Sequence, residues 1–494
     1  MSNAGPQLND PRRFWGLGEV LYLAAPTSLA MVNVTLMQFI DGLMVARIQP
    51  NGPEALSAQF AAGMFSFVPS TLMLGTLAVI NTFVAQNFGA RRLDRCGQYA
   101  WQGLYMGWAW WLLLLGLIPL APALFGLVGH APAVQAMEVM YFRYIIAAEG
   151  IMLASRVIER FFYGVHRPAV VYVSSLVANV VNILGDWVLI FGKWGFPAMG
   201  LHGAAIATVA GMAAGLAILA AAFLSPAIAR QFGTRRQWRL HGGQIREIWR
   251  VGWPAGMQFF LDMLGWGLCI TVLVGSIDTV GGEPLSDAGT VHLTATSVVM
   301  RYMRLSFMPA VGIGLATTAL VGKYIGAGRM HLVKRRVGAA VVLGVAYMGL
   351  CGLAFWLLRY PMVRWFVSLD PLKGAQAAAQ LEMIVGVGAK VMICAAVFQV
   401  FDGVGIVYIG ALRGAGDTLW PMVVSGVLAG VIVLGGGTFM LAVLPGLESV
   451  GVWIAGSAFV ISLGVAMCLR FQSGRWQRIN LLEGREAPAA TNQR

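Results

Sequence analysis

The sequence predicts an all-α integral membrane protein with twelve transmembrane helices, arranged as two pseudo-symmetric six-helix lobes around a central cavity. Three observations lead to this prediction: an apolar composition, a one-sided distribution of basic residues and an internal repeat. Hydrophobic residues make up 58% of the 494-residue chain and charged residues only 11%, whereas about a quarter of a soluble domain is charged. The 62 glycines suit helices that pack closely within a bilayer.

Twelve stretches of the chain are long and apolar enough to cross a membrane, which takes roughly 20 residues per helix. We expect them at about residues 18–46, 56–84, 99–127, 139–163, 169–191, 201–225, 251–276, 290–320, 337–358, 381–411, 419–444 and 449–470. The fourth and eighth stretches are the least apolar. The eighth holds Arg301 and Arg304, and the fourth holds four charged residues that we expect to form mainly structural ion pairs.

Basic residues indicate the orientation of these helices, because cytoplasmic loops are enriched in Lys and Arg. If both termini are inside, the inner segments carry 24 of the 34 Lys and Arg residues and the outer segments carry 5. We therefore expect a multi-pass protein of the cell inner (plasma) membrane with both termini cytoplasmic. The same asymmetry accounts for the net charge of +13, so we expect no nucleic-acid partner. We also expect a monomer within the lipid bilayer.

Two pairs of segments match at similar distances along the chain. "GTLAVINTFVAQNFGARR" (75–92) aligns with "GIGLATTALVGKYIGAGR" (312–329) at a shift of 237, and "GLHGAAIAT" (200–208) aligns with "ESVGVWIAG" (448–456) at a shift of 248. Both copies then keep the same orientation, and the axis that relates them runs along the membrane normal, as in transporters with parallel repeats. The expected division is an N-terminal lobe at 13–228, a basic cytoplasmic linker at 229–249, a C-terminal lobe at 250–472 and a cytoplasmic tail at 473–494.

Two carboxylates interrupt the apolar stretches of the first half. Asp41 and Asp186 each lie about five residues from the outer end of their stretch, which puts both roughly 7–8 Å deep. Asn179 and Asn182 precede Asp186 at a spacing that places all three on one helical face. Thr208 enters the next helix from the outside, at a depth near that of Asn182.

Carboxylates inside a membrane are by default proton or cation sites. Burial in hydrocarbon favours the protonated form, so such a group can exchange protons. Carboxylate and amide oxygens could also coordinate Na+ at Asp41, Asn182 and Asp186. The alternative to both is a hydrogen-bonded helix contact with a structural role alone. We expect a proton or a small hard cation at these residues and no other cofactor.

The second half has its own candidate set. Gln258 and Asp262 lie one turn apart in the seventh stretch, and Asp402 lies in the tenth. These carboxylates either form a second cation-coupling site or pair with basic residues nearby. In the first stretch, Pro26 prevents one backbone hydrogen bond and should kink the helix, as a hinge or as a static bend.

With these residues in view, the chain resembles the multidrug and toxic compound extrusion (MATE) transporters from about residue 15 to 472. The resemblance rests on the order and spacing of several motifs. They are "FIDGLMVA", "VAQNFGARR", "NILGDWVLIFG", "GLHGAAIAT", "PAGMQFFLD", "MPAVGIGLATTALVGKYIGAGR" and "ALRGAGDT".

The resemblance implies a V-shaped cavity between two lobes and alternating access. The cation-site positions of the family match Asp41, Asn182, Asp186 and Thr208 in the first lobe. In the second lobe, Asp262 stands where many members have glutamate, and Asp402 matches an acidic position. Pro26 matches a familiar proline of the first helix. The resemblance leaves open which lobe carries the coupling site.

We therefore expect a secondary antiporter that exports amphipathic, cationic organic compounds such as drugs and toxins in exchange for H+ or Na+. The alternative is a lipid-linked oligosaccharide flippase of the same superfamily, whose basic cavity Arg301 and Arg304 would suit. We expect no enzymatic activity, because the sequence has no DDxxD pair, no HExxH and no clustered histidines. ATP-driven transport is also disfavoured, since there is no GxxxxGK[ST] loop.

Overall fold

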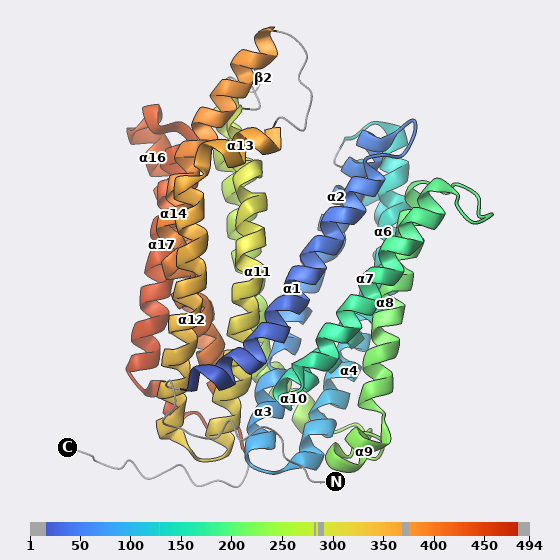
Figure 1. Cartoon of the computed structure of the whole chain (residues 1–494), viewed down its shortest axis with the longest axis vertical. Helices are drawn as coiled ribbons and strands as arrows, with labels where there is room; N and C mark the ends of the chain where they lie inside the picture. The colour runs from blue at the N-terminus through green and yellow to red at the C-terminus, as the bar shows by residue number, and fades with distance from the viewer. Residues whose placement is uncertain (1–15, 128, 281–282, 285–290, 368–374, 483–494) are drawn as a thin grey trace.

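The computed structural model describes residues 16–127, 129–280, 283–284, 291–367 and 375–482, and nearly all of them are helical (Figure 1). The first half contains α1 (Leu17–Val45), α2 (Gly52–Ala78), α3 (Ile80–Gly89), α4 (Leu93–Leu115), α5 (Ala121–Gly126), α6 (Pro132–Gly164), α7 (Pro168–Phe191), α8 (Leu201–Phe223) and α9 (Pro226–Phe232). Residues 13–15 of the predicted N-terminal lobe and residues 483–494 of the predicted tail lie outside the described residues.

The second half contains a similar series of long helices. They are α10 (Gly242–Leu268), continued by the π-helix η2 (Cys269–Val274), then α11 (Val291–Gly326), α12 (Met330–Leu357), α13 (Arg359–Val367), α14 (Ala375–Ala415), α15 (Leu419–Leu428), the π-helix η4 (Ala429–Gly436), α16 (Gly437–Val443) and α17 (Glu448–Gln472). Short 3-10 turns are η3 (Gly275–Asp278), η5 (Pro445–Leu447) and η6 (Arg475–Arg478). A two-residue strand pair, β1 (Thr279–Val280) and β2 (Glu283–Pro284), lies between η3 and α11.

Ten helical segments of the described chain are long and apolar enough to cross a membrane. The helices α4 (23 residues) and α6 (33 residues) are long enough as well. Charged residues along α6, and the glutamines, tyrosines and tryptophans of α4, lower their hydropathy. With these two, the layout is the predicted one of twelve spans. Several helices run past the predicted ends, as α11 does to Gly326 and α14 does to Ala415. Hydropathy marks the hydrocarbon layer, whereas a helix continues into the polar layer beyond it.

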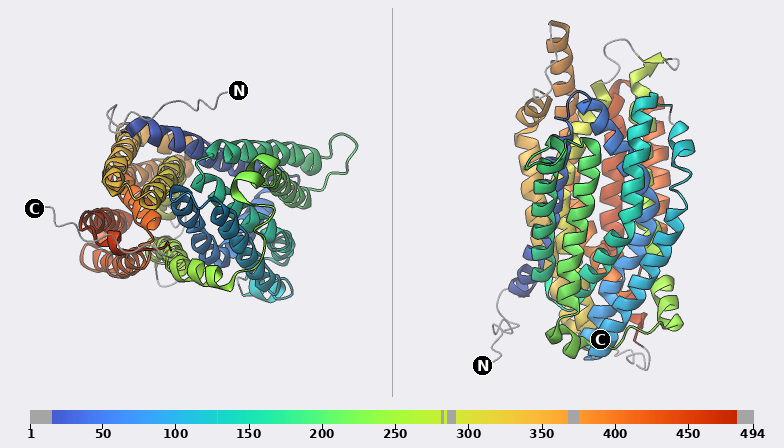
Figure 2. Two further views of the ribbon diagram at one scale, coloured as in Figure 1. Left: turned by 90° about the horizontal axis from the view of Figure 1, so that it is seen from below. Right: turned by 90° about the vertical axis from the view of Figure 1, so that its right-hand side faces the viewer.

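The helices form two groups that meet at one end and diverge at the other (Figure 1). We call the end where α1 begins and α17 ends the base, and the opposite end the rim. Seen from below in Figure 2, α11 to α17 gather on one side and most helices of the first half on the other, while α1 reaches across from one group to the other. The fold therefore has the two-lobed architecture that the repeat predicts.

Backbone geometry shows the repeat directly. Gly200, which precedes α8, has φ 54° and ψ −129°, and Glu448, which begins α17, has φ 48° and ψ −131°. These two positions are the first aligned pair of the 248-residue shift. Such angles are nearly exclusive to glycine, so their agreement at two aligned positions confirms that the two segments are structural copies of each other.

Close backbone contacts between the two halves occur at the base, and they too obey the repeat. A Cβ added to Gly89 would lie 2.0 Å from the carbonyl oxygen of Lys323, and one added to Gly326 would lie 1.9 Å from that of Gln86. The first contact becomes the second when 237 is added to or subtracted from each residue number. Only glycine permits α3 and α11 to approach this closely, so the base contact is specified by two equivalent glycines.

Polar contacts join the halves at the same end. The carboxylate of Glu19 in α1 accepts bonds from Lys323 Nζ (2.9 Å), the Tyr324 hydroxyl (2.6 Å) and Arg336 Nε (2.7 Å). Gln86 Nε2 also donates to the carbonyl oxygen of Gly414 at 3.0 Å. These bonds hold α1 and α3 of one half against α11, α12 and α14 of the other.

Candidate functional site: a buried carboxyl pair near the rim

Asp41 lies in the last turns of α1, near the rim, and only 9% of it is exposed. Its Oδ2 accepts a hydrogen bond of 2.7 Å from Gln59 Nε2 in α2. Its Oδ1 is buried and accepts no bond from any described donor. One oxygen of this carboxyl group is therefore fixed, and the other is available to a proton or a cation.

Asp186 in α7 is fully buried, and its carboxyl group lies within hydrogen-bonding reach of the Asp41 carboxyl group. Neither oxygen of Asp186 accepts a bond from a described donor. Two carboxyl groups in contact and shielded from water cannot both remain ionised without a positive charge between them. The pair therefore has to hold a proton or a small cation.

Asn182 lies one turn before Asp186 on the same face of α7 and is 1% exposed. Neither its Oδ1 nor its Nδ2 has a hydrogen-bond partner among the described residues. An unsatisfied buried amide costs about 1–3 kcal/mol, so a polar ligand at this point would remove that cost.

Two further side chains complete the site, and the sequence reasoning missed both. Gln59 Nε2 lies 3.3 Å from the hydroxyl oxygen of Tyr141 in α6, which is 4% exposed. The Tyr141 hydroxyl is also within hydrogen-bonding reach of Thr208 in α8. The structure thus brings the predicted Asp41, Asp186 and Thr208 into one network, with Gln59 and Tyr141 as links.

Close packing of α8 against α7 positions this network. A Cβ on Gly203 would lie 2.6 Å from the backbone carbon of Leu189, so glycine is needed for the approach. Asn179 has a different place from the other predicted residues. Its Nδ2 donates to the backbone oxygen of Asn33 at 2.7 Å, which ties α7 to α1 and uses its amide group in a helix contact.

The second predicted set is only partly assembled. Oδ1 of Asp262 in α10 accepts a hydrogen bond from the Ser425 hydroxyl in α15. Asp402 in α14 lies near enough to Asp262 for their charges to interact, while Gln258 is buried one turn earlier on α10. Neither carboxylate forms an ion pair with a basic residue within the described ranges. Unlike Asp41 and Asp186, both are partly exposed.

Pro26 lies inside α1, nearer the base than Asp41. Two residues later, the Ser28 hydroxyl donates to the backbone oxygen of Pro309 in α11 at 2.7 Å. The proline of the first helix therefore lies beside a contact between the two halves.

His166, between α6 and α7, belongs to the base contact. Its Nε2 lies 3.3 Å from the carbonyl oxygen of Ala319 in α11, and its ring stacks on Phe88 at 5.6 Å. Burial, and then the positive charge of Lys323, lower the pKa of His166 from 6.5 to about 3. The histidine is consequently neutral while the base is closed.

The rim site has the chemistry expected of a site for a proton or a small cation. Acidic, amide and hydroxyl oxygens converge there, and no group of three or more His, Cys, Asp or Glu side chains is clustered for a metal anywhere in the described parts. A bound Na+ would therefore draw on amide and hydroxyl oxygens as well as on the two carboxylates. A proton would need only the carboxyl pair.

The family model MatE matches residues 26–188 and 265–436. The chain is a member of the MATE family. Members of this family are membrane transporters, and the matched residues include Asp41, Asp186 and Asp402.

Relatives and solved structures agree with this. The chain is 28% identical over 481 residues to a probable multidrug resistance protein NorM of Mesorhizobium japonicum, with 95% of each chain covered. It is 29% identical over 483 residues to a protein of the same description in Rhizobium meliloti, again with 95% of each covered. A solved structure described as the outward-facing conformation of a multidrug resistance MATE family transporter superposes with a TM-score of 0.80, at 18% identity, over 97% of this chain and 100% of the other. That likeness concerns the fold alone.

Proposed function

We propose that this MATE transporter is a secondary active antiporter that exports amphipathic organic cations, such as drugs and toxins, in exchange for H+ or Na+. The observation that carries the proposal is the carboxyl pair of Asp41 and Asp186, buried together near the rim with three oxygens that no described donor satisfies. The multidrug resistance described for the NorM relatives supports a drug-like substrate.

Alternating access supplies the coupling in this proposal. The halves are in contact at the base and diverge toward the rim, so an ion from the rim side can reach the pair while the base stays closed. Its binding neutralises the carboxyl groups, which favours the opposite arrangement. The ion is then released as the base opens, while the linker at residues 229–249 keeps the two lobes joined.

We place the protein in the cell inner membrane as a monomer, with both termini and the base on the cytoplasmic side. Support comes from the basic residues, which cluster in the loops at the base. The alternative coupling site lies in the second lobe and consists of Gln258, Asp262 and Asp402. The arginines Arg301 and Arg304 are exposed on the rim half of α11.

The test is transport of a fluorescent cation by purified protein in proteoliposomes, under separately imposed pH and Na+ gradients. The wild type should transport under one gradient, and Asp41→Asn should abolish transport and drug-efflux-dependent resistance without lowering expression. Glu54→Gln, which alters an exposed carboxylate near the rim, is the matched control and should behave as wild type. Unchanged resistance in Asp41→Asn would refute the assignment, and loss only in Asp262→Asn would move the coupling site to the second lobe.

A flippase for lipid-linked oligosaccharides is the second candidate. It is favoured by Arg301, which is exposed with its guanidinium 5.0 Å from the centre of the Phe366 ring. A cation beside an apolar ring suits a pyrophosphate next to a lipid chain. Binding of a lipid-linked sugar without binding of cationic dyes would select this function.

A further inference from the structure

The segment that connects the two halves between α9 and α10 is hydrogen-bonded to α4 at the base. Trp101 Nε1 in α4 donates to the Thr234 carbonyl at 2.7 Å, Gln102 Nε2 donates to that of Arg239 at 3.0 Å, and the Tyr105 hydroxyl donates to that of Trp238. These three bonds hold residues 234–239, which we call the strap, against one face of α4. The connection therefore belongs structurally to the first half.

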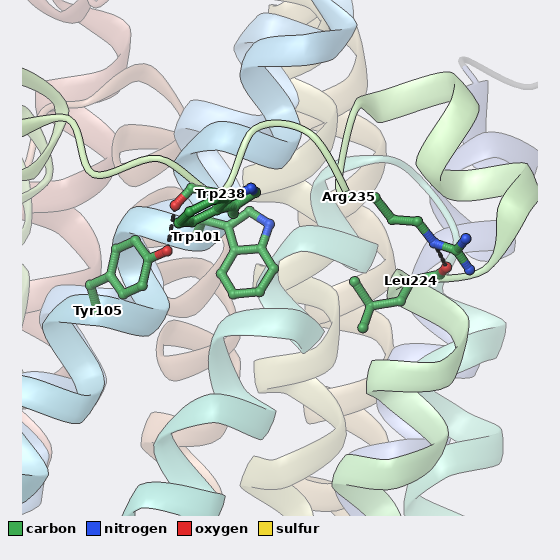
Figure 3. Close-up of a pocket in the computed structure, with 5 residues that line it drawn as sticks. All are labelled: Trp101, Tyr105, Leu224, Arg235 and Trp238. Carbon is green, nitrogen blue, oxygen red and sulfur yellow. Dashed lines mark hydrogen bonds between the residues drawn. The ribbon is translucent and has the colours of Figure 1, made fainter.

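A surface pocket of about 520 Å³ opens between this strap, α4 and the end of α8. Figure 3 shows Trp101, Tyr105 and Trp238 gathered on one side of it, with Leu224 and Arg235 on the other. Arg235 Nε donates to the Leu224 carbonyl at 2.7 Å. That bond fixes the guanidinium at the pocket edge through a single nitrogen.

The pocket lies where the apolar part of the bundle ends. The sequence from α8 to Leu224 contains no Asp, Glu, Lys or Arg, and the first basic residue after it is Arg230. Trp and Tyr favour the level of lipid headgroups. On the same face of α4, Trp108 and Leu112 are 38% and 62% exposed, and they continue the apolar surface from the pocket toward the membrane centre.

The connecting segment itself carries charge of one sign, and the acid beside its start is Asp94 of α4, next to Gly233. Residues 225–246 contain five arginines and no aspartate or glutamate, and Arg235, Arg236 and Arg239 are exposed. The neighbouring acid Glu247 already accepts a hydrogen bond from Tyr99 at 2.6 Å. Basic clusters directly next to a membrane helix attract the anionic headgroups of the cytoplasmic leaflet.

We propose that this pocket binds an anionic phospholipid of the inner leaflet. Its phosphate lies at Arg235, with Arg239 of the same segment adding positive charge. Its glycerol region lies beside Trp101 and Trp238, and one acyl chain runs along Tyr105, Trp108 and Leu112. The cytoplasmic placement rests on the proposed orientation, whereas the binding chemistry does not. A lipid held here bridges the strap and the first lobe.

The test is native mass spectrometry of the full chain in detergent, titrated with phosphatidylglycerol or with phosphatidylcholine of the same acyl chains. Phosphatidylglycerol should bind the wild type more tightly. The double variant Arg235→Gln/Arg239→Gln should weaken that binding about thirtyfold, with little effect on phosphatidylcholine. The matched control is Lys334→Gln/Arg335→Gln, which removes two exposed basic side chains at the base of α12 and should leave the tightest site intact.

Other results would overturn the proposal. Equal losses in the two double variants would mean a diffuse charge effect, and displacement of the lipid by inorganic phosphate would mean a simple anion site. A second measurement does not depend on charge removal. The fluorescence of Trp238 is obtained by subtracting the signal of Trp238→Phe from that of the wild type. Brominated phosphatidylglycerol should quench this fluorescence more than brominated phosphatidylcholine does. Equal quenching by both lipids would contradict headgroup recognition. Neither measurement needs transport, so failure here is separate from failure of the antiporter proposal.

Discussion

Gln59 Nε2 donates a 2.7 Å hydrogen bond to Oδ2 of Asp41 and leaves Oδ1 of the same carboxyl group without a donor. The amide thus fixes the orientation of Asp41 while one oxygen still faces the site. A hydrogen bond to a charged group contributes about 1.5–3 kcal/mol. Because this bond favours the ionised carboxyl group, it should set how strongly the pair holds its ion.

Gln59→Leu should therefore change the dependence of transport on the driving ion without abolishing transport. If H+ drives transport, the variant should hold its proton more strongly, and the pH of half-maximal transport should rise by about one unit or more. If Na+ drives it, the apparent Na+ affinity should fall about tenfold. Proteoliposome transport measured against pH and Na+ concentration distinguishes the two, and Gln38→Leu, an exposed glutamine one turn from Asp41, serves as control. An unshifted ion dependence would show that Gln59 has no part in the site.

Gly89→Leu should prevent the two halves from closing at the base. A Cβ there would lie 2.0 Å from the Lys323 carbonyl oxygen, a backbone atom that cannot move aside cheaply. We expect faster hydrogen–deuterium exchange at the ends of α3 and α11 and at least a tenfold loss of transport. The control is Gly338→Leu in α12, where an added Cβ meets no atom within 4 Å. Normal exchange at the base in Gly89→Leu would contradict the close approach.

Lowering the pH should destabilise the contact between the two halves at the base of the molecule, because of His166. The pKa of His166 is lowered from 6.5 to about 3 in the folded protein. The histidine is therefore protonated in the unfolded chain at pH values where it stays neutral in the folded protein. Its contribution to the free energy of unfolding is complete above pH 6.5 and is lost as the pH falls from there toward 3. Between pH 7.5 and 5.5 this loss is about 1 kcal/mol. Melting temperatures should fall less over this range in His166→Asn than in wild type, since asparagine tolerates the positive φ of 61°. The exposed His331→Asn should melt with the wild-type pH dependence, and an identical slope in all three proteins would exclude His166 as the origin.

Pro26→Ala should stiffen α1. Alanine restores a backbone donor and removes a residue that costs about 3 kcal/mol within a helix, so the melting temperature should rise. If Pro26 is a hinge, the transport rate should fall several-fold while ion affinity stays the same. Pro69→Ala makes the same change inside α2 and should raise stability without slowing transport. Equal rates in Pro26→Ala and wild type would leave Pro26 a static bend.

The pairing of Asp41 with Asp186 follows from the sequence, because both lie at one depth in helices that run in the same direction. The roles of Gln59 and Tyr141 do not follow. A glutamine near a membrane surface and a tyrosine among other aromatics are ordinary, and only helix packing brings them to Asp41. The contact of Ser425 with Asp262 does not follow from the sequence for the same reason, since the two residues are 163 positions apart. Helix ends such as Gly326 were misjudged because an apolar pattern stops at the hydrocarbon boundary.

Glu448 keeps, with a bulky side chain, the bend that Gly200 makes freely. The two lobes therefore have the same backbone conformation at this position, but it costs more free energy at a glutamate than at a glycine. The second lobe carries torsional strain there that the first does not. A descendant chain with glycine at 448 would relax that corner and leave the architecture as it is.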